Sequence, residues 1–465
     1  MKKIVRKQQS ALHHWRRIGA LRIHSFSVVS LFLLGFSCPL AWAQQLAISA
    51  TTLHTVSSSG TIQDGVVLIE NGKITQIGSA ADITVPDGYE RLTSDTITPG
   101  FIDAHSVVGL AGWYNVLADQ DQDETTAPNQ AELRAIDGFN PSEPLLAYLL
   151  QHGVTVIQAG PGRSNPIGGQ AGIFKTHGST VEAMTIRFPS AMIFTLGEVP
   201  KKTYGERKQT PMTRMGTAAL IRQALLGAQS YAKQWQDYVS STDETSADEV
   251  SADEVSVDEV SVDEVSEDKD HKAPDRDLKK EALAAVVQGE LPALFTVHRE
   301  DDILTALRIA KEFNLTLLLD AATEGYLVVP EIQQAGVPVI VHPSMQRISS
   351  LETSNTSLEN AAILADAGIR IALQSGFESY VPKTRIVLFE AAIAMVNGLG
   401  FERALRAITL DAAQILGIDA RVGSLEPGKD ADLVLFDGDP FEYTSHIQTV
   451  ILNGQVVYQR PLVSP

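Results

Sequence analysis

The chain has 465 residues, enough for about two to four domains or for one large barrel with attachments. Hydrophobic residues make up 44% and charged residues 20%, which excludes a wholly disordered chain, a collagen and a protein with many membrane spans. The formal net charge is −19, and residues 243–270 contribute −12 of it through thirteen acidic residues and one lysine. Because nucleic-acid binding needs a basic face, this balance argues against a nucleic-acid partner.

The first 43 residues have the pattern of a secretory signal peptide. A cationic start without acidic residues is followed by an apolar run over 26–36 and by the small-x-small triplet that ends at Ala43. The run is too short to span a bilayer, so we expect membrane attachment only through an uncleaved signal. The sequence predicts an exported, periplasmic protein. Cys38 is the only cysteine, which excludes an intrachain disulfide and leaves a lipoprotein signal as the weaker alternative.

Both ends of the mature chain are rich in short strands. Residues 66–69 and 74–77 flank an Asn-Gly pair, and a second Asn-Gly pair at 453–454 separates two apolar runs near the C-terminus. Asn-Gly between apolar runs is a strong signal for a tight hairpin. The sequence therefore predicts one small β-sandwich built from residues 44–98 and 416–465.

The middle of the chain, residues 99–415, alternates strands with helices. Apolar runs adjoin segments of helical pattern, such as 301–313; these runs are 155–157, 294–297, 315–319, 337–341 and 369–373. Repeated βα units predict a parallel sheet, and about 300 residues suit a (β/α)8 barrel of the TIM type. The predicted fold class is therefore α/β, a TIM-like barrel plus a β-sandwich.

An acidic insertion interrupts the barrel at about 240–275. Residues 246–265 are four copies of Ser-(Ala/Val)-Asp-Glu-Val, a period too short for a solenoid unit. Dense negative charge with few aromatic residues predicts a disordered, solvated surface segment. The preceding residues 217–239 have a helical pattern.

Four stretches together resemble the amidohydrolase superfamily, and within it the imidazolonepropionase-like amidohydrolases. They are TPGFIDAH at 98–105, GVTV at 153–156, HREDDI at 298–303 and GSLEPGKDADL at 423–433. Three further stretches fit the same group: PGRSNPIGGQ at 161–170, GEVPKKTYG at 197–205 and TRMG at 213–216. The resemblance implies a barrel with a composite β-sandwich, and hydrolysis of amide or cyclic amide C–N bonds by one or two divalent metals.

The resemblance also implies six metal-site groups at the C-terminal ends of barrel strands, and two of them are present, His105 and His298. At the other four expected positions the sequence has residues without a side-chain atom that could bind a metal ion, namely Val107, Ile193, Ala321 and Gly376. Alternative ligands, which need a shifted alignment or another strand, are Lys175, Asp320 and Glu378. Two histidines make a weak zinc site, because such sites usually need at least three protein ligands. We therefore expect at most one divalent metal ion, such as zinc, bound weakly or not at all, and the catalytic residues stay unassigned.

Three further residues are candidates for substrate contact. His342 ends a barrel strand, Arg299 follows His298, and Glu124 lies in an acidic loop after the first barrel strand. Each also has a plainer interpretation: a structural histidine, a salt bridge that starts a helix, and a solvated acidic loop.

Two functions remain open on the sequence alone. One is an exported hydrolase of non-peptide C–N bonds with a reduced metal site. The other is an inactive relative that binds a small amide-type ligand or pairs with an active homologous amidohydrolase. A homo-oligomer is the general expectation.

Overall fold

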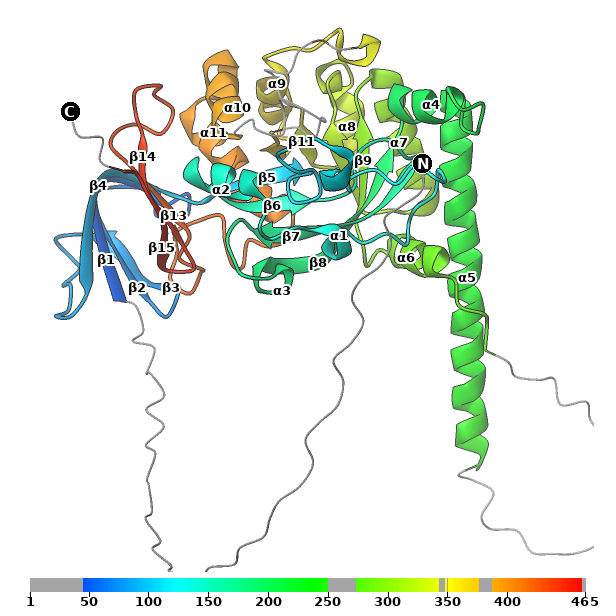
Figure 1. Ribbon diagram of the computed structural model, residues 1–465, viewed down its shortest axis with the longest axis horizontal. Coiled ribbons are helices and arrows are strands. Elements are labelled where there is room, and N and C mark those ends of the chain that lie inside the picture. Colours follow the sequence, from blue (N-terminus) through cyan, green and yellow to red (C-terminus); the bar gives the residue numbers. More distant parts are fainter. Residues whose placement is uncertain (1–44, 250–272, 343–347, 349, 376–386, 462–465) are drawn as a thin grey trace, which may run out of the picture. The chain divides into compact units, whose positions relative to one another are not determined.

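The computed structural model describes residues 45–249, 273–342, 348, 350–375 and 387–461. Two sheets organise them, one of eight strands and one of seven (Figure 1). In these ranges no helix combines the length and the apolar character needed to cross a membrane. The predicted signal peptide, residues 1–43, lies outside the described residues.

The eight-stranded sheet forms the barrel and follows chain order. Its strands are β5 (Phe101–Ser106), β6 (Val154–Ala159), β7 (Ile167–Lys175), β8 (Thr185–Thr195), β9 (Ala293–Val297), β10 (Leu317–Ala321), β11 (Val339–Val341) and β12 (Ile371–Leu373). Just after β12, the backbone N–H of Ser375 donates to Asp103 Oδ1 on β5 at 3.0 Å, which links the two ends of the sheet. Asp103 is fully buried, and burial raises the pKa of its carboxyl to about 6.

One strand departs from the predicted parallel order. β7 runs antiparallel to both β6 and β8, whereas β8, β9, β10, β11 and β12 run parallel to one another. Residues 160–166 join β6 to β7 without a helix, and a parallel crossover needs about a dozen residues or more. The short connection therefore makes the chain turn back at this point.

Apolar side chains fill the barrel between its strands. Ile102, Ile193 and Leu318 belong to one buried cluster there, together with residues of the segment 412–422. The backbone N–H of Ile102, at the start of β5, donates to Ile408 O at 2.8 Å. The segment after Ile408 therefore closes the N-terminal end of the barrel, which leaves the polar residues at the C-terminal ends of the strands for the site.

Helices surround the barrel strands, as the alternating pattern predicts. They are α1 (Ala135–Gly138), α2 (Pro144–Gln151), α3 (Val181–Met184), α4 (Glu198–Gly205), α5 (Arg214–Glu249), α6 (Leu278–Val287), α7 (Glu300–Phe313), α8 (Val329–Ala335), α9 (Asn360–Asp366), α10 (Val387–Ala394), α11 (Phe401–Ala407) and α12 (Leu410–Ile415). Shorter turns are η1 (Leu117–Asp119), η2 (Gly325–Leu327), η3 (Leu351–Thr353) and η5 (Met395–Leu399). α7 confirms the helix predicted at 301–313.

The long helix α5 corrects the predicted start of the acidic insertion. It is the longest helix in Figure 1 and continues through 240–249, where the composition predicts disorder. A helix that is already nucleated adds further residues at low cost, which carries α5 into a segment made mainly of Ser, Thr and Asp. Residues 250–272, most of the rest of the insertion, lie outside the described residues.

The seven-stranded sheet combines strands from both ends of the described chain. Its strands are β1 (Gln45–His54), β2 (Thr61–Glu70), β3 (Lys73–Ser79), β4 (Glu90–Pro99), β13 (Leu433–Phe436), β14 (Ile447–Leu452) and β15 (Gln455–Gln459). Their order is β15-β14-β13-β4-β1-β2-β3, so the C-terminal strands pair with β4 from the N-terminal part. The composite sheet therefore depends on both ends of the sequence.

Both Asn-Gly hairpins are confirmed. Asn71 and Gly72, between β2 and β3, have φ of 52° and 78°. Asn453 and Gly454, between β14 and β15, have φ of 50° and 73°. Positive φ at both central residues is the geometry that Asn-Gly favours in tight hairpins.

A buried ion cluster joins this sheet to the barrel. Lys175, at the end of β7, contacts Asp432 and lies 3.2 Å from Asp430 Oδ2, and all three side chains are buried. Lys73 and Arg421 also contact Asp430, at 2.6 Å and 2.8 Å. The ammonium group of Lys175, an alternative metal ligand on the sequence, is therefore engaged in a structural ion cluster.

Candidate functional site

A fully buried polar layer crosses the barrel next to its apolar filling. His105 Nδ1, on β5, lies 3.0 Å from Asp320 Oδ2, on β10. Thr296 Oγ1, on β9, donates to the same carboxylate oxygen at 2.7 Å, and Gln374 Nε2 donates to the other oxygen at 2.7 Å. A buried carboxylate needs such donors, because leaving it without them costs several kcal/mol or more. Asp320, on β10, thus links side chains from β5, from β9 and from the residue just after β12.

A second group lies at the end of β9 and is built around His298. The imidazole is buried; its Nδ1 lies 2.8 Å from Thr323 Oγ1 and its Nε2 lies 3.5 Å from Arg163 Nη1. The ring centroid of His342, which follows β11, lies 5.0 Å away, with the two rings nearly perpendicular at 76°. Burial, with the nearby His342 and Arg163, holds the pKa of His298 well below its ordinary value. His298 is therefore neutral at neutral pH.

The loop that carries Arg163 is fixed by hydrogen bonds to the segment 122–124. Gly162 N donates to Gln122 O at 2.7 Å, and Ser164 N donates to Asp123 Oδ1 at 3.1 Å. Residues on both sides of Arg163 are therefore tied to the same neighbouring segment.

The next residue of the loop extends these ties to a helix. Asn165 Nδ2 donates to Glu124 O at 2.8 Å, and Asn165 Oδ1 accepts a hydrogen bond from the hydroxyl of Tyr204 on α4. Tyr204 is fully buried. The family-like stretches at 161–170 and 197–205 thus support each other and hold Arg163 next to His298.

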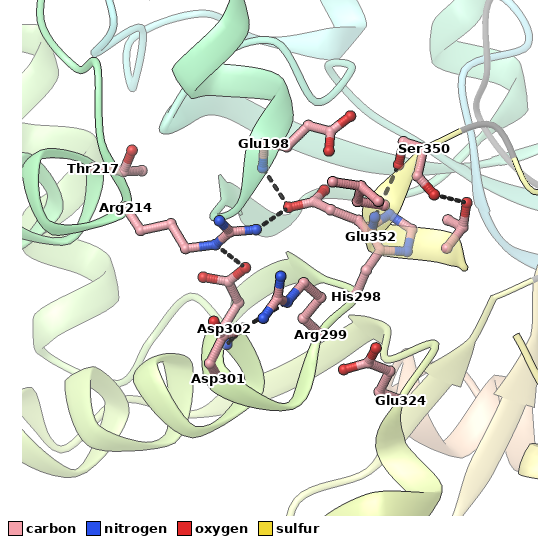
Figure 2. A network of polar contacts seen from close by, with 12 residues as sticks. Glu198, Arg214, Thr217, His298, Arg299, Asp301, Asp302, Glu324, Ser350 and Glu352 are labelled. Atoms are coloured by element: carbon pink, nitrogen blue, oxygen red, sulfur yellow. Dashed lines mark hydrogen bonds and ion pairs between the residues drawn. The ribbon is translucent and has the colours of Figure 1, made fainter. Parts of the chain in front are cut away.

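A second network lies beside His298, as Figure 2 shows. Arg214, at the start of α5, donates to Asp302 Oδ2 on α7 at 2.9 Å and to Glu352 Oε1 in η3 at 3.0 Å. Glu352 also accepts the backbone N–H of Glu198 at the start of α4. Burial and the neighbouring Asp302 raise the pKa of Glu352 to about 7, and burial raises the pKa of Asp302 as well. The guanidinium of Arg214 therefore forms ion pairs with two buried carboxyl groups.

Gly197 allows this network to form. Its φ is 92°, and a Cβ built there would collide with Glu352 Oε1. Only glycine combines that backbone conformation with the close approach of a carboxylate. The stretches at 197–205 and 213–216 thus converge on Glu352.

Three of the expected ligand positions lie in the described residues and are apolar there. Val107 packs with Ala111, and Ile193 lies in the apolar filling of the barrel. Ala321 ends β10, fully buried, and it and Ala322 have left-handed φ of 68° and 43°, a conformation that costs non-glycine residues energy. None of these side chains offers an atom that could bind a metal ion.

The remaining position, Gly376, and its alternative Glu378 lie outside the described residues. In the part of the chain that the structure describes, no group of three or more His, Cys, Asp or Glu side chains is arranged to hold a metal ion. His105 and His298 each lie against a protein side chain there, Asp320 and Arg163.

The three candidates for substrate contact lie in different surroundings. His342 is buried and lies beside His298. Arg299 is 37% exposed and pairs with Asp301 at the start of α7, and Glu124 is exposed. Of the three, the structure therefore brings His342 to the His298 group.

Several residues that complete these groups are not singled out by the sequence. Arg163 stands out there only as part of a family-like stretch, and Thr296 and Gln374 give no signal of their own. A polar residue two places after an inward apolar residue on a barrel strand would point to Thr296 and Asp320, because strand residues alternate between faces. Leu294 and Leu318 are those inward residues.

Two comparisons show which family this chain resembles, one over residues 326–457 and the other over most of its length. A family model described as "Amidohydrolase family" matches residues 326–457. A solved amidohydrolase structure from Thermotoga maritima is 33% identical with a TM-score of 0.76, and the alignment covers 89% of this chain and all of that one.

Two curated relatives are more distant in sequence. Amidohydrolase tasK of Hapsidospora irregularis is 26% identical over 86% of this chain, but the chain spans only 40% of that protein's length. Imidazolonepropionase of a Geobacillus strain is 22% identical, over 85% of this chain and 90% of that enzyme. The barrel, the composite sheet and these matches lead to one conclusion. This chain belongs to the amidohydrolase family, a family of hydrolases of carbon–nitrogen bonds.

Proposed function

We propose that this chain is an exported amidohydrolase-family protein that binds a small amide-type molecule at the mouth of its barrel without the two-metal chemistry of the family. The observation that carries the proposal is the surroundings of the two family-like histidines. His105 faces the carboxylate of Asp320, and His298 Nε2 faces the guanidinium of Arg163. Nδ1 of His105 and Nε2 of His298 thus each face a protein group.

The donor set supports the same proposal. Catalytic zinc sites usually have three protein ligands and an open position. Here Val107, Ile193 and Ala321 are buried side chains without donor atoms, at positions where the resemblance implies ligands. The described residues therefore do not fit the two-metal site, and we derive no step through a metal.

Residual hydrolysis of a C–N bond is the second candidate, and one observation favours it. His298 lies between a hydroxyl group, on Thr323, and a fixed cation, on Arg163. A neutral imidazole can act as a general base, and a guanidinium can stabilise negative charge that develops on a carbonyl oxygen. For this reaction the guanidinium has to turn from His298 Nε2 to the ligand oxygen, so that His298 becomes the proton acceptor and Arg163 stabilises the developing charge.

One experiment separates the two candidates. A library of small amides, cyclic amides and acylated amino acids is screened by thermal shift against the full chain, and each hit is then tested for hydrolysis by mass spectrometry, with and without EDTA. The proposal expects hits that raise the melting temperature to the same extent with EDTA, and no hydrolysis that EDTA abolishes. Hydrolysis that needs an added divalent metal contradicts the proposal, and hydrolysis that is insensitive to EDTA favours the second candidate.

Export is part of the proposal and rests on residues 1–43. The cationic start, the apolar run and the Ala41-Trp42-Ala43 triplet together support a cleaved signal. We also propose, from the sequence pattern, that residues 44–98 and 416–465 form the β-sandwich and that residues 99–415 form the barrel. A homo-oligomer, or pairing with a homologous amidohydrolase, stays a proposal from the sequence.

A further inference from the structure

Arg163 contacts His298, one of the two histidines that the resemblance assigns to the metal site. Arg163 Nη1 lies 3.5 Å from His298 Nε2, and His298 Nδ1 lies 2.8 Å from Thr323 Oγ1. Arginine can only donate hydrogen bonds, whereas a neutral imidazole has one donor and one acceptor nitrogen. The contact therefore makes Nε2 the acceptor and leaves the hydrogen on Nδ1, which donates to Thr323.

We propose that the guanidinium of Arg163 is a built-in cation that takes the place of a metal ion at His298. The lone pair of Nε2 can point to the guanidinium or to a metal, but not to both. A divalent cation at this nitrogen would also meet the positive charge of Arg163 at close range, in a buried setting that screens charge weakly. The inference deepens the proposed function, and rests on it for the ligand.

The fixed loop makes this arrangement a property of the fold. Arg163 follows Gly162, whose position next to Asp123 leaves no room for a Cβ, since one built there would lie 2.7 Å from Asp123 Oδ2. The neighbouring residues Ser164 and Asn165 are both hydrogen-bonded to the segment 123–124. The backbone that carries the guanidinium is therefore placed before any ligand arrives.

A fixed guanidinium also defines the class of ligand. It has five N–H donors in a planar fork, which can contact His298 and a ligand oxygen at once. Carboxylate oxygens suit this fork best, and amide carbonyl oxygens are the neutral alternative. The ligand class is thus a small molecule that presents a carboxylate or an amide carbonyl to the barrel mouth.

The test is a zinc titration of the full chain by isothermal calorimetry, without any ligand. We expect Arg163→Met to bind Zn²⁺ at least about tenfold more tightly than the original protein, because His298 Nε2 then becomes available beside His342. Arg163→Lys keeps a positive charge and should bind zinc as weakly as the original. Arg299→Met removes the arginine that pairs with Asp301, so it should leave the zinc affinity unchanged.

Two outcomes of the zinc titration would contradict the proposal. Equal zinc affinity of the original protein and Arg163→Met, or a gain in Arg299→Met as large as in Arg163→Met, would overturn the proposal. If Arg163→Met does not fold, the ¹⁵N spectrum of the histidines in the original protein decides. The proposal expects His298 to carry its hydrogen on Nδ1, and a hydrogen on Nε2 would overturn it. None of these readouts needs a ligand, so they stay valid if the proposed function fails.

Discussion

Replacing Glu352 by glutamine should change how the stability of this protein depends on pH. Glu352 is buried, shares Arg214 with Asp302, and has a pKa raised to about 7 from its ordinary value of 4.5. A carboxyl whose pKa is higher in the folded than in the unfolded state binds its proton more tightly in the folded state. Its contribution to stability is therefore present at low pH and is lost as the pH rises through the folded pKa.

The size of the effect follows from the two pKa values. Stability falls over the pH window between the ordinary pKa of 4.5 and the raised pKa of about 7. Each pKa unit corresponds to about 1.4 kcal/mol, so the original protein should lose on the order of 2 kcal/mol through this group between about pH 5 and about pH 8. Glutamine has a similar shape and does not titrate in this range, so Glu352→Gln should lack this part of the pH dependence.

Urea unfolding at several pH values, followed by circular dichroism, measures the difference. The control is Glu331→Gln, which removes an exposed carboxyl group on α8 and should leave the pH dependence of the original protein unchanged. Parallel curves of unfolding free energy against pH for the original protein and Glu352→Gln would refute the reasoning. So would a curve for the original protein that rises, relative to the variant, between about pH 5 and about pH 8.

Three further predictions concern the ion cluster, a glycine and the leader. Lys175→Met leaves Asp430 and Asp432 with less compensation in a buried site and should cost about 3–5 kcal/mol of unfolding free energy. In the same denaturant assay, Lys73→Met removes a half-exposed partner and should cost less than about 1 kcal/mol, and equal losses would contradict this account. Gly197→Ala should lower stability by about 1–3 kcal/mol, because of its positive φ and the approach of Glu352. Gly205→Ala, with open space around it, should be neutral or stabilising, and similar melting temperatures for both variants would count against the role of Gly197. Mass spectrometry of the exported protein should find an N-terminus just after Ala43, and a lipid on Cys38 would contradict that prediction.

Local chemistry explains which parts of the fold the sequence predicts. The two Asn-Gly hairpins follow from residues that tolerate positive φ, and helix α7 follows from its apolar period. The reversal at β7 does not emerge, because the pattern of a strand is the same in either direction. Only the short connection 160–166 reveals it, and recognising that connection requires the strand ends to be known.

The site depends more on contacts that are distant in the sequence. His298 stands out because it follows a clear apolar strand, yet its partner Arg163 lies 135 residues earlier, in a loop. The sequence offers Asp320 only as a ligand under a shifted alignment, since the direction of its side chain depends on the register of β10 in the barrel. Glu352 gives no signal at all, because its partners, the guanidinium of Arg214 and the backbone N–H of Glu198, come from two different helices.

The most direct test of the central claim is the metal content of the full-length protein, purified without chelator or metal-affinity resin and measured by elemental mass spectrometry. The account predicts a folded protein with far less than one zinc, manganese, iron, cobalt or nickel ion per chain, because His298 Nε2 faces Arg163 and the buried side chains of Val107, Ile193 and Ala321 offer no ligand atom. A stoichiometric divalent metal ion that is lost in a His298→Ala variant would contradict it.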